Sequence, residues 1–449
     1  MKEAKMQKSN KTEGSERSSS VREIIDSGPL TPGILMIAGV CFLLNVLDGY
    51  DIVSMSAGAT LIQSEWGLSS IEKGYILTAA LLGMAMGASF LAPWCDKFGR
   101  RPMILGALIC TSSCLIVSSL IQESLQQMIG VRLVTGLGIG VIMASTTAIT
   151  IEYTPEKWKN FIVPIVVSGY PLGALCVGPI AQLVLPLYGW QMMFLGGGVL
   201  GFMFVPVVYF FLPESLNFME VQKQNHVEWL RRINKSLSFV RREKIDQMPL
   251  EKISFEVRGG SAIFGKQYFM KTVVLVTCFF AAYLTIYFLL TWIPSLYESV
   301  GYSRSQGINA LTLLNFGGVI GIFAIAVITL HLNLSVTLGI GFFLAAGLLV
   351  SFSAVQPDNL FSLNLMIWAI GVALYGAFTG MYTVVSRAYG VTERATGIGF
   401  SLGIGRLGAV ASPILAGFLV DAGWTMYALF VVFSIPALVV SFFMFLQKC

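Results

Sequence analysis

The sequence predicts an all-α membrane protein with twelve transmembrane helices in two halves of six, and three observations lead to this fold class. Of the 449 residues, 55% are hydrophobic and only 12% are charged, whereas soluble proteins carry about 25% charged residues. The apolar residues form about twelve stretches near the ~20-residue length of a bilayer-spanning helix. One polar segment, residues 213–270, separates six of these stretches from the other six. This composition excludes a soluble enzyme, a disulfide scaffold and a disordered chain.

The chain accordingly divides into a polar tail (1–33), a first six-helix bundle (34–212), a central loop (213–270) and a second six-helix bundle with a short tail (271–449). The tail lacks the apolar core of a cleavable signal peptide, so the first span is expected to act as the insertion signal. The spans are expected near 34–61, 74–94, 102–121, 126–151, 160–183, 190–212, 271–296, 305–330, 335–355, 360–386, 395–420 and 424–446.

Lysine and arginine are divided unequally between the two sides of these spans. The tail, the central loop and the turn at 97–101 fall on one side, and the other side carries little beyond Lys73 and Arg304. Because cytoplasmic loops carry an excess of basic residues, both termini are expected in the cytoplasm.

The central loop is basic and is expected to contain an amphipathic helix. Val227, Leu230, Ile233, Leu237 and Val240 recur at helical spacing. We interpret this segment as a linker helix on the cytoplasmic face rather than as a partner-binding site. Its basic side chains can snorkel to a membrane interface without a protein partner.

The two halves show a short internal repeat. Tyr153 precedes Tyr170 at the same spacing at which Tyr389 precedes Arg406. Repeated halves are typical of secondary transporters, and this repeat would place Tyr170 and Arg406 on opposite sides of one cavity.

Small residues also recur four apart, which lets helices approach closely in lipid. These pairs are Gly83/Gly87, Gly136/Gly140, Gly317/Gly321, Gly376/Gly380 and Gly399/Gly403.

Ionisable residues inside a span are costly and therefore informative. Asp48 lies about 21 Å along a helix that starts near residue 34, close to the membrane midplane. Asp51 shares its face three residues later. Two carboxylates so close and partly dehydrated do not both ionise easily, which suits a proton carrier. The alternative is that one of them only braces neighbouring helices through hydrogen bonds.

Two arginines also lie within spans. Arg406, about 18 Å into the eleventh span, offers a guanidinium fork that matches a carboxylate. It is interpreted as a substrate-carboxylate site, as a permanent salt-bridge partner of Asp48 or Asp51, or as each in turn. Arg132, in the fourth span, is expected to couple to the aspartate pair or to snorkel outwards.

Tyrosines at mid-depth are suited to stack on a planar ring and to hydrogen-bond its substituents, and core packing is the alternative for each. The candidate substrate-binding side chains, besides Arg406, are Tyr50, Tyr170, Tyr283, Tyr287, Asn315, Tyr375 and Tyr382.

In the turn between the second and third spans, Asp96, Arg100 and Arg101 surround Gly99. These charges are expected to latch helix ends in one state and to release them in another.

These motifs resemble the major facilitator superfamily. Asp96-Lys-Phe-Gly99-Arg100-Arg101 resembles its loop motif between spans two and three, and Arg132-x3-Gly136-x-Gly138 resembles its fourth-span motif. Within the superfamily, Asp48-Gly-Tyr-Asp51 is similar to the first span of the aromatic acid:proton symporter family. Other similar segments are Glu152-Tyr-x-Pro155, Leu212-Pro-Glu214-Ser215, Trp292-Ile-Pro294, Arg394-Ala-Thr-Gly397 and Gly405-Arg406-x-Gly408.

The resemblance implies proton-coupled uptake of small aromatic carboxylates, such as hydroxybenzoates, across a bacterial inner membrane. The proton gradient would supply the energy, so no cofactor and no metal are expected. The partners would be the anion, protons and the bilayer, with no nucleic acid, and the protein is expected to be a monomer. The functional candidates it implies are Asp48, Asp51, Asp96, Arg100, Glu152 and Arg406, with Arg394 added as a gating residue.

The sequence departs from the superfamily pattern at Ala92, where the loop motif begins with glycine, and at 331–335, where an Asp-Arg latch is absent.

The alternatives to uptake of an aromatic acid are transport of nicotinate, an aliphatic acid or a sugar-like metabolite, a drug:proton antiporter, and a non-transporting sensor. Gln182 and Leu183 stand where antiporters carry glycines, which counts against efflux. The only histidines, His226 and His331, lie near no nucleophile or ligand cluster, so an enzyme is not expected.

Overall fold

The computed structural model describes residues 21–221, 226–245, 264–265, 267–355, 359–389 and 394–446. These residues form long helices joined by short turns. The first half contains α3 (Pro32–Trp66), α4 (Ser70–Met86), η1 (Gly87–Leu91), η2 (Ala92–Trp94), α5 (Cys95–Phe98), α6 (Arg100–Leu120), α7 (Leu125–Tyr153), α8 (Glu156–Val167) and α9 (Gly169–Phe211). The second half contains α12 (Phe269–Ser299), α13 (Arg304–Ile328), α14 (Leu334–Val355), α15 (Leu360–Ala388), α16 (Arg394–Asp421) and α17 (Met426–Leu446).

The described helices confirm twelve membrane crossings. Eleven helical stretches are long and apolar enough to span a membrane, and one of them, Phe161–Phe211, contains two crossings. Gly189, with φ 72°, breaks α9 between these crossings. Only glycine adopts that backbone conformation readily. The fifth crossing is itself interrupted at Ser168, where α8 ends and α9 begins.

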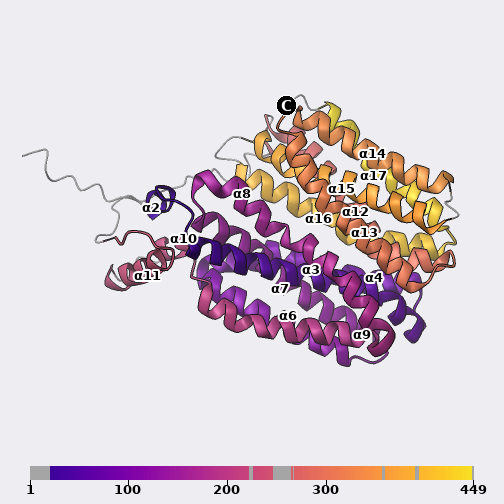
Figure 1. The fold of residues 1–449 in the computed structure, drawn as a ribbon, viewed down its shortest axis with the longest axis horizontal. Helices are drawn as coiled ribbons and strands as arrows, with labels where there is room; N and C mark the ends of the chain where they lie inside the picture. The colour runs from indigo at the N-terminus through magenta and orange to yellow at the C-terminus, as the bar shows by residue number, and fades with distance from the viewer. Residues whose placement is uncertain are drawn as a thin grey trace, which may run out of the picture.

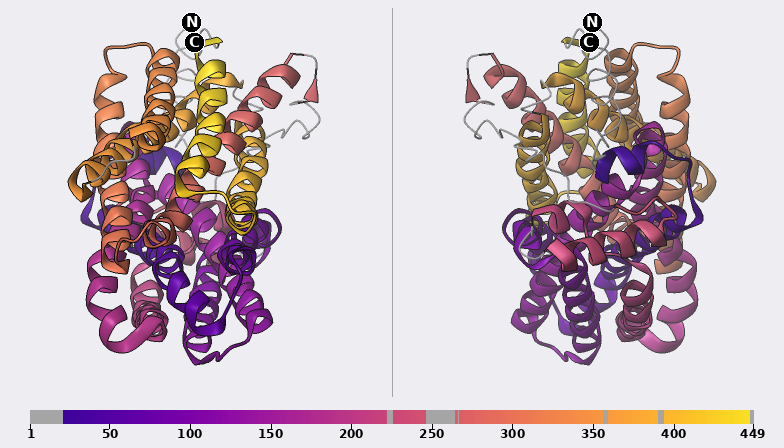
Figure 2. Two further views of the ribbon diagram at one scale, coloured as in Figure 1. Left: turned by 90° about the vertical axis from the view of Figure 1, so that its right-hand side faces the viewer. Right: turned by 90° about the vertical axis from the view of Figure 1, so that its left-hand side faces the viewer.

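The two halves lie side by side, and each packs through helix contacts of its own. Figures 1 and 2 show the first half, from indigo to magenta, against the second half, from orange to yellow. Within the first half α3 packs on α9 and α4 on α7, and within the second half α13 packs on α15 and α14 on α17. The predicted arrangement of two six-helix halves is therefore confirmed.

Small residues allow several of these close contacts. Gly83 lies against the carbonyl of Leu133 and Gly136 against that of Ala80, so α4 and α7 meet backbone to backbone as predicted. The expectation is wrong for Gly399 and Gly403, where a Cβ would have no neighbour within 4 Å. In α16 the close approach is instead made by glycines 405 and 408, which face α12.

Three short helices cover one end of the first half: α2 (Val21–Asp26), α10 (Leu216–Val221) and α11 (His226–Phe239). Figure 1 shows α2 and α11 at the left end of the bundle, which we call the α11 end; the opposite end is called the far end. Ile233 and Leu237 of α11 are 0% exposed, as their helical spacing predicted, whereas Val227 is 75% exposed and does not belong to the buried face. The helix packs on the first half through Trp229 as well.

The two halves contact each other through α4 with α16, α9 with α13 and α3 with α12. Most of the hydrogen bonds between them lie towards the far end. The hydroxyl of Ser56 donates to the carbonyl of Leu290 at 2.7 Å, and Asp421 accepts the N–H of Ser70 at 2.9 Å. The structure is thus one in which the halves are joined at the far end.

Candidate functional site

A buried ion pair joins the first and fourth crossings. Arg132 on α7 donates from Nη1 to Oδ1 of Asp51 on α3 at 2.6 Å, and the two side chains are 1% and 4% exposed. The guanidinium also lies over the ring of Phe194 at 5.5 Å. The expectation that Arg132 couples to the aspartates is confirmed, and the alternative that it snorkels outwards is wrong.

Asp48 has no such partner. It is 5% exposed, and its Oδ2 atom accepts no hydrogen bond from the described residues; the same is true of Oδ2 of Asp51. Both aspartates line a cavity of about 20 Å³ inside the first half, together with Thr111 and Ser112. That volume is close to the room needed for one water molecule. A buried carboxylate without a cation is costly, and none of the ion pairs among the described residues includes Asp48.

The hydroxyls of that cavity can accept hydrogen bonds. Thr111 and Ser112 each donate their own proton to the carbonyl of Leu108, at 3.0 and 2.7 Å. Their oxygen lone pairs are therefore left to accept from a protonated carboxyl or a water.

Tyr50 belongs to this first-half cluster. Its hydroxyl donates to the carbonyl of Met193 at 3.0 Å, and its ring lies next to Gly197. The structure thus places Tyr50 on the wall of the aspartate cavity, with its hydroxyl bound inside the first half.

Arg406 on α16 lies among tyrosines from both halves. Its charge acts on the hydroxyl groups of Tyr283, Tyr287 and Tyr382 in the second half and on that of Tyr170 in the first. Its Nη1 atom is buried and has no partner. Among the described residues, none of the ion pairs involves Arg406.

The absence of a carboxylate at Arg406 overturns one expectation. A permanent salt bridge to Asp48 or Asp51 is wrong for this structure. Arg132 already holds Asp51, and Asp48 faces the cavity inside the first half. Arg406 is left as a half-buried cation whose ionisable neighbours, among the described residues, are tyrosine phenols.

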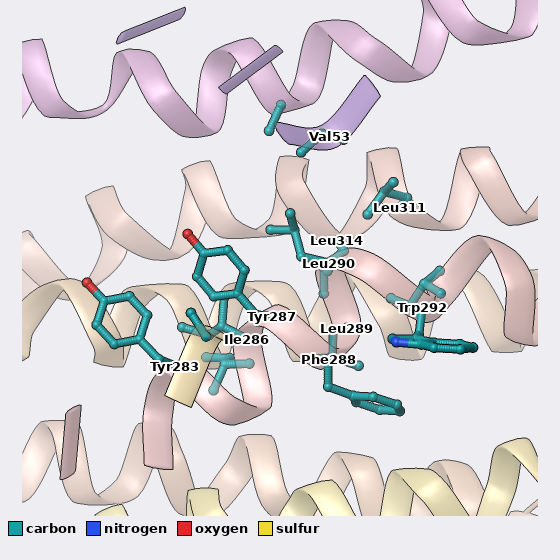
Figure 3. Packing of buried hydrophobic residues seen from close by; sticks show 14 of the residues in the cluster. Val53, Tyr283, Ile286, Tyr287, Phe288, Leu289, Leu290, Trp292, Leu311 and Leu314 are labelled. Atoms are coloured by element: carbon teal, nitrogen blue, oxygen red, sulfur yellow. The ribbon is translucent and has the colours of Figure 1, made fainter. Parts of the chain in front are cut away.

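The tyrosine hydroxyls around Arg406 lie close to one another. Tyr283 and Tyr382 are 3.3 Å apart, and Tyr170 of the first half lies 3.4 Å from Tyr287 of the second. Figure 3 shows the rings of Tyr283 and Tyr287 one turn apart on α12 and directed to the same side. Tyr170 and Arg406, predicted to lie on opposite sides of one cavity, come from opposite halves, and both lie near Tyr287.

Two further candidates extend this group. Asn315 on α13 is 0% exposed and donates to the carbonyl of Leu311 at 2.9 Å. Its side-chain oxygen accepts a long hydrogen bond from Tyr375 at 3.5 Å. The group therefore combines one guanidinium, several hydroxyls and aromatic faces.

The aspartate cluster and the tyrosine cluster are in backbone contact. Gly49, between the two aspartates, lies directly against the carbonyl of Tyr170, and Gly173 lies against the carbonyl of Val46. Helices α3 and α9 approach so closely only because these positions lack a Cβ. This contact joins the helix of the two aspartates to Tyr170, the residue that meets Tyr287.

A polar network holds the α11 end of the first half. Arg100 binds Oε1 of Glu152 at 2.6 Å, and Glu152 accepts from the hydroxyl of Ser215 at 2.7 Å. Glu214 accepts the backbone N–H groups of Arg100 and Arg101 at 2.7 and 3.1 Å. These five residues are called the loop latch.

The loop latch differs from the predicted one in its acidic partners. Asp96 has a side chain that is 74% exposed and lies 3.7 Å from Arg100, so Glu152 is the main partner. Gly99 has φ 96°, which explains why glycine stands there. Arg101 also donates to the carbonyl of Tyr209, while the side chain of Arg394 lies outside the described residues.

Sequence reasoning did not assign Glu214 and Ser215 to this network. The segment Pro213-Glu214-Ser215 was visible, but nothing in its spacing connects it to a turn more than 110 residues earlier. Within the part of the chain that the structure describes, no group of three His, Cys, Asp or Glu side chains is placed to hold a metal.

The fold and the two buried clusters define a membrane transporter built from two helical halves. The family model of the Major Facilitator Superfamily matches residues 40–377, and the chain belongs to this superfamily. It is therefore a transporter and not an enzyme.

Individual relatives agree with this assignment. The chain is 30% identical over 420 residues to the 4-hydroxybenzoate transporter PcaK of Pseudomonas aeruginosa, covering 93% of both chains. It is 29% identical to a benzoate transport protein of Acinetobacter baylyi, covering 94% of this chain and 91% of that protein. Among solved structures, a D-xylose-proton symporter matches with a TM-score of 0.68 and 16% identity, over 92% of this chain and 97% of that one.

Proposed function

We propose that the protein is a proton-coupled symporter that takes up a small aromatic carboxylate. The observation that carries this proposal is Arg406, a half-buried cation whose Nη1 atom is buried and unpaired, with no carboxylate partner among the described residues. A guanidinium fork recognises a carboxylate through paired hydrogen bonds. The surrounding tyrosine rings suit a planar aromatic group and its hydroxyl substituents.

Asp48 and Asp51 take the proton role. Asp51 is the fixed counterion of Arg132, and Asp48 is the carboxyl that a proton neutralises. The contact of Gly49 with Tyr170 provides a mechanical connection from the proton to the substrate group. The relatives that transport 4-hydroxybenzoate and benzoate support the substrate class.

The distribution of basic residues supports a cytoplasmic α11 end and an outer far end. The protein would then lie in the inner membrane of a bacterium with both termini in the cytoplasm. In this orientation the structure corresponds to a state that is closed to the outside, and the loop latch holds the cytoplasmic end of the first half. The proton gradient supplies the energy, and a monomer without a cofactor is sufficient.

The test is uptake of labelled 4-hydroxybenzoate into liposomes with an imposed inward proton gradient. Gradient-driven accumulation is expected for the wild type. Arg406→Ala is expected to abolish it, and Arg406→Lys to retain part of it, because lysine keeps the charge and loses the fork. Arg231→Ala, an exposed arginine on α11, is the matched control and is expected to behave as the wild type.

The proton role is separated from binding by counterflow, the exchange of labelled for unlabelled substrate without a gradient. Asp48→Asn is expected to lose accumulation and to keep counterflow, because a neutral side chain mimics the protonated state. A folded wild type that transports neither 4-hydroxybenzoate, benzoate nor nicotinate would refute the proposed substrate class. Accumulation that survives in Asp48→Asn would refute the proton assignment.

A further inference from the structure

A buried lysine lies in the contact between the halves at the far end. Lys73 on α4 is 3% exposed. Its ammonium donates to Oε1 of Gln63 at 2.7 Å and to the hydroxyl of Ser295 at 2.9 Å, and it lies 4.2 Å from the ring centre of Trp292. Gln63 and Lys73 belong to the first half, whereas Trp292 and Ser295 belong to α12 of the second.

This ammonium has only neutral partners. None of the ion pairs among the described residues includes Lys73. The acidic groups that attract it from the second half, Glu298 and Asp421, are engaged elsewhere. Glu298 binds Arg304 at 3.1 Å, and Asp421 accepts backbone N–H groups at the start of α4.

A charge is a costly way to seal this contact. A buried ammonium that lacks an anion loses hydration that neutral hydrogen bonds replace only in part. A neutral or apolar side chain would close the same gap at lower cost. The position of the charge therefore points to a role in another state of the protein.

Parting of the halves at the far end would expose this group. Transporters of this kind work by rocking one half against the other. In that motion Ser295 and Trp292 leave with the second half, while Gln63 stays beside Lys73. The ammonium then has free donors, and the amide of Gln63 adds a further N–H donor, so the pair fits a carboxylate.

Lys73 differs from Arg304, the other basic residue described at this end, in having no carboxylate partner. Arg304 is already paired with Glu298. Within the part of the far end that the structure describes, Lys73 is thus the basic residue without a carboxylate partner. Glu65 and Glu72 add negative charge nearby on the first half, and an approaching anion would be repelled by them.

We propose that Lys73, assisted by Gln63, is an entry site that binds the substrate carboxylate from the outer side before Arg406 does. This inference rests on the proposed function, because it takes an organic carboxylate as the substrate. It assigns a second cationic site, at the outer mouth, to the path of the anion.

The experiment measures initial uptake into proteoliposomes over a range of external 4-hydroxybenzoate concentrations. Lys73→Gln is expected to raise the external KM about tenfold, the effect of one charge-assisted hydrogen bond, with the maximal rate within about twofold. Lys73→Arg is expected to restore most of the affinity. Arg304→Gln removes a charge from the same end that is already neutralised, and it is expected to leave KM within about twofold.

Ionic strength gives a second readout. Wild-type uptake at low substrate is expected to fall as salt screens the ammonium, and Lys73→Gln is expected to be less sensitive to salt. If Lys73 only holds the far end closed, its loss favours the outward-open state, and the external KM falls or stays unchanged. That result, in a Lys73→Gln protein with the wild-type elution profile, overturns the entry site.

Failure of the proposed function looks different. In that case the wild type itself shows no saturable uptake of an aromatic carboxylate. If Lys73→Gln does not fold, the comparison is made with Gln63→Ala, which keeps the ammonium and removes its neighbour. A smaller rise in external KM is expected there, and an unchanged KM contradicts the assistance by Gln63.

Discussion

The contact of Gly49 with Tyr170 leads to a sharp test of how the two buried clusters are connected. An ideal Cβ on Gly49 would overlap the backbone carbonyl oxygen of Tyr170 and crowd its carbonyl carbon. A backbone carbonyl in the middle of a helix cannot turn away as a flexible side chain can. Gly49→Ala therefore forces α3 and α9 apart. Gly39 lies on the same helix, and a Cβ there meets nothing within 4 Å.

The magnitude follows from comparing these two substitutions. Each replaces glycine by alanine inside α3 and gains about 1 kcal/mol of helix propensity, so this gain cancels in the comparison. Overpacking of a tight contact costs about 1–3 kcal/mol, and the upper end applies because the obstacle is backbone. A difference of about 3 kcal/mol corresponds to roughly 6–12 °C in the melting temperature of a body as large as one half.

The assay is thermal unfolding of the two purified variants in the same detergent, followed by uptake and counterflow in liposomes. Gly39→Ala is expected to melt at or slightly above the wild-type temperature and to transport normally. Gly49→Ala is expected to melt well below it and to lose accumulation. Equal melting temperatures for the two variants would refute the reasoning, because the packing against Tyr170 would then have no energetic consequence.

Three further outcomes are expected. Arg132→Met leaves Asp51 buried without its cation and is expected to cost about 3–5 kcal/mol of folding free energy. Adding Asp51→Asn should restore the folded yield on size exclusion but not the accumulation of substrate. A double variant that is no better folded than the single one would contradict the pairing. Gly189→Ala places an L residue at φ 72° and is expected to cost about 1–3 kcal/mol, seen as a lower melting temperature. Ile233→Asp, at a position 0% exposed, should release α11 and speed its proteolysis, whereas Val227→Asp, 75% exposed, should not.

Much of the fold could be predicted because lipid imposes a strict rule on sequence. A span must be a continuous apolar helix, since backbone groups find no other partner in lipid. The crossings were therefore visible from composition alone. What escaped was their fine structure: the interruption of the fifth crossing at Ser168 and the choice of glycines that make contacts in α16.

The sequence was enough to predict which charged residues lie inside the membrane. It was not enough to predict which of them form pairs. Charge inside a span singled out Asp48, Asp51, Arg132 and Arg406. Spacing along one helix cannot say which helix lies opposite, so the partner of Arg132 and the missing partner of Arg406 were left open. The neighbours of Tyr50 were left open for the same reason, and the structure shows that its hydroxyl is directed to the carbonyl of Met193.

By itself, the sequence determined the class of protein, the number of crossings and the identity of the costly buried charges, since each follows from the free energy of placing a residue in lipid. Only the tertiary structure decided that Asp51 is neutralised by Arg132, that Asp48 faces a water-sized cavity, and that Arg406 is surrounded by phenols. Only it brought Lys73 into the contact between the halves. These pairings join residues far apart in the chain, and packing of whole helices, which no local pattern records, sets which of them meet.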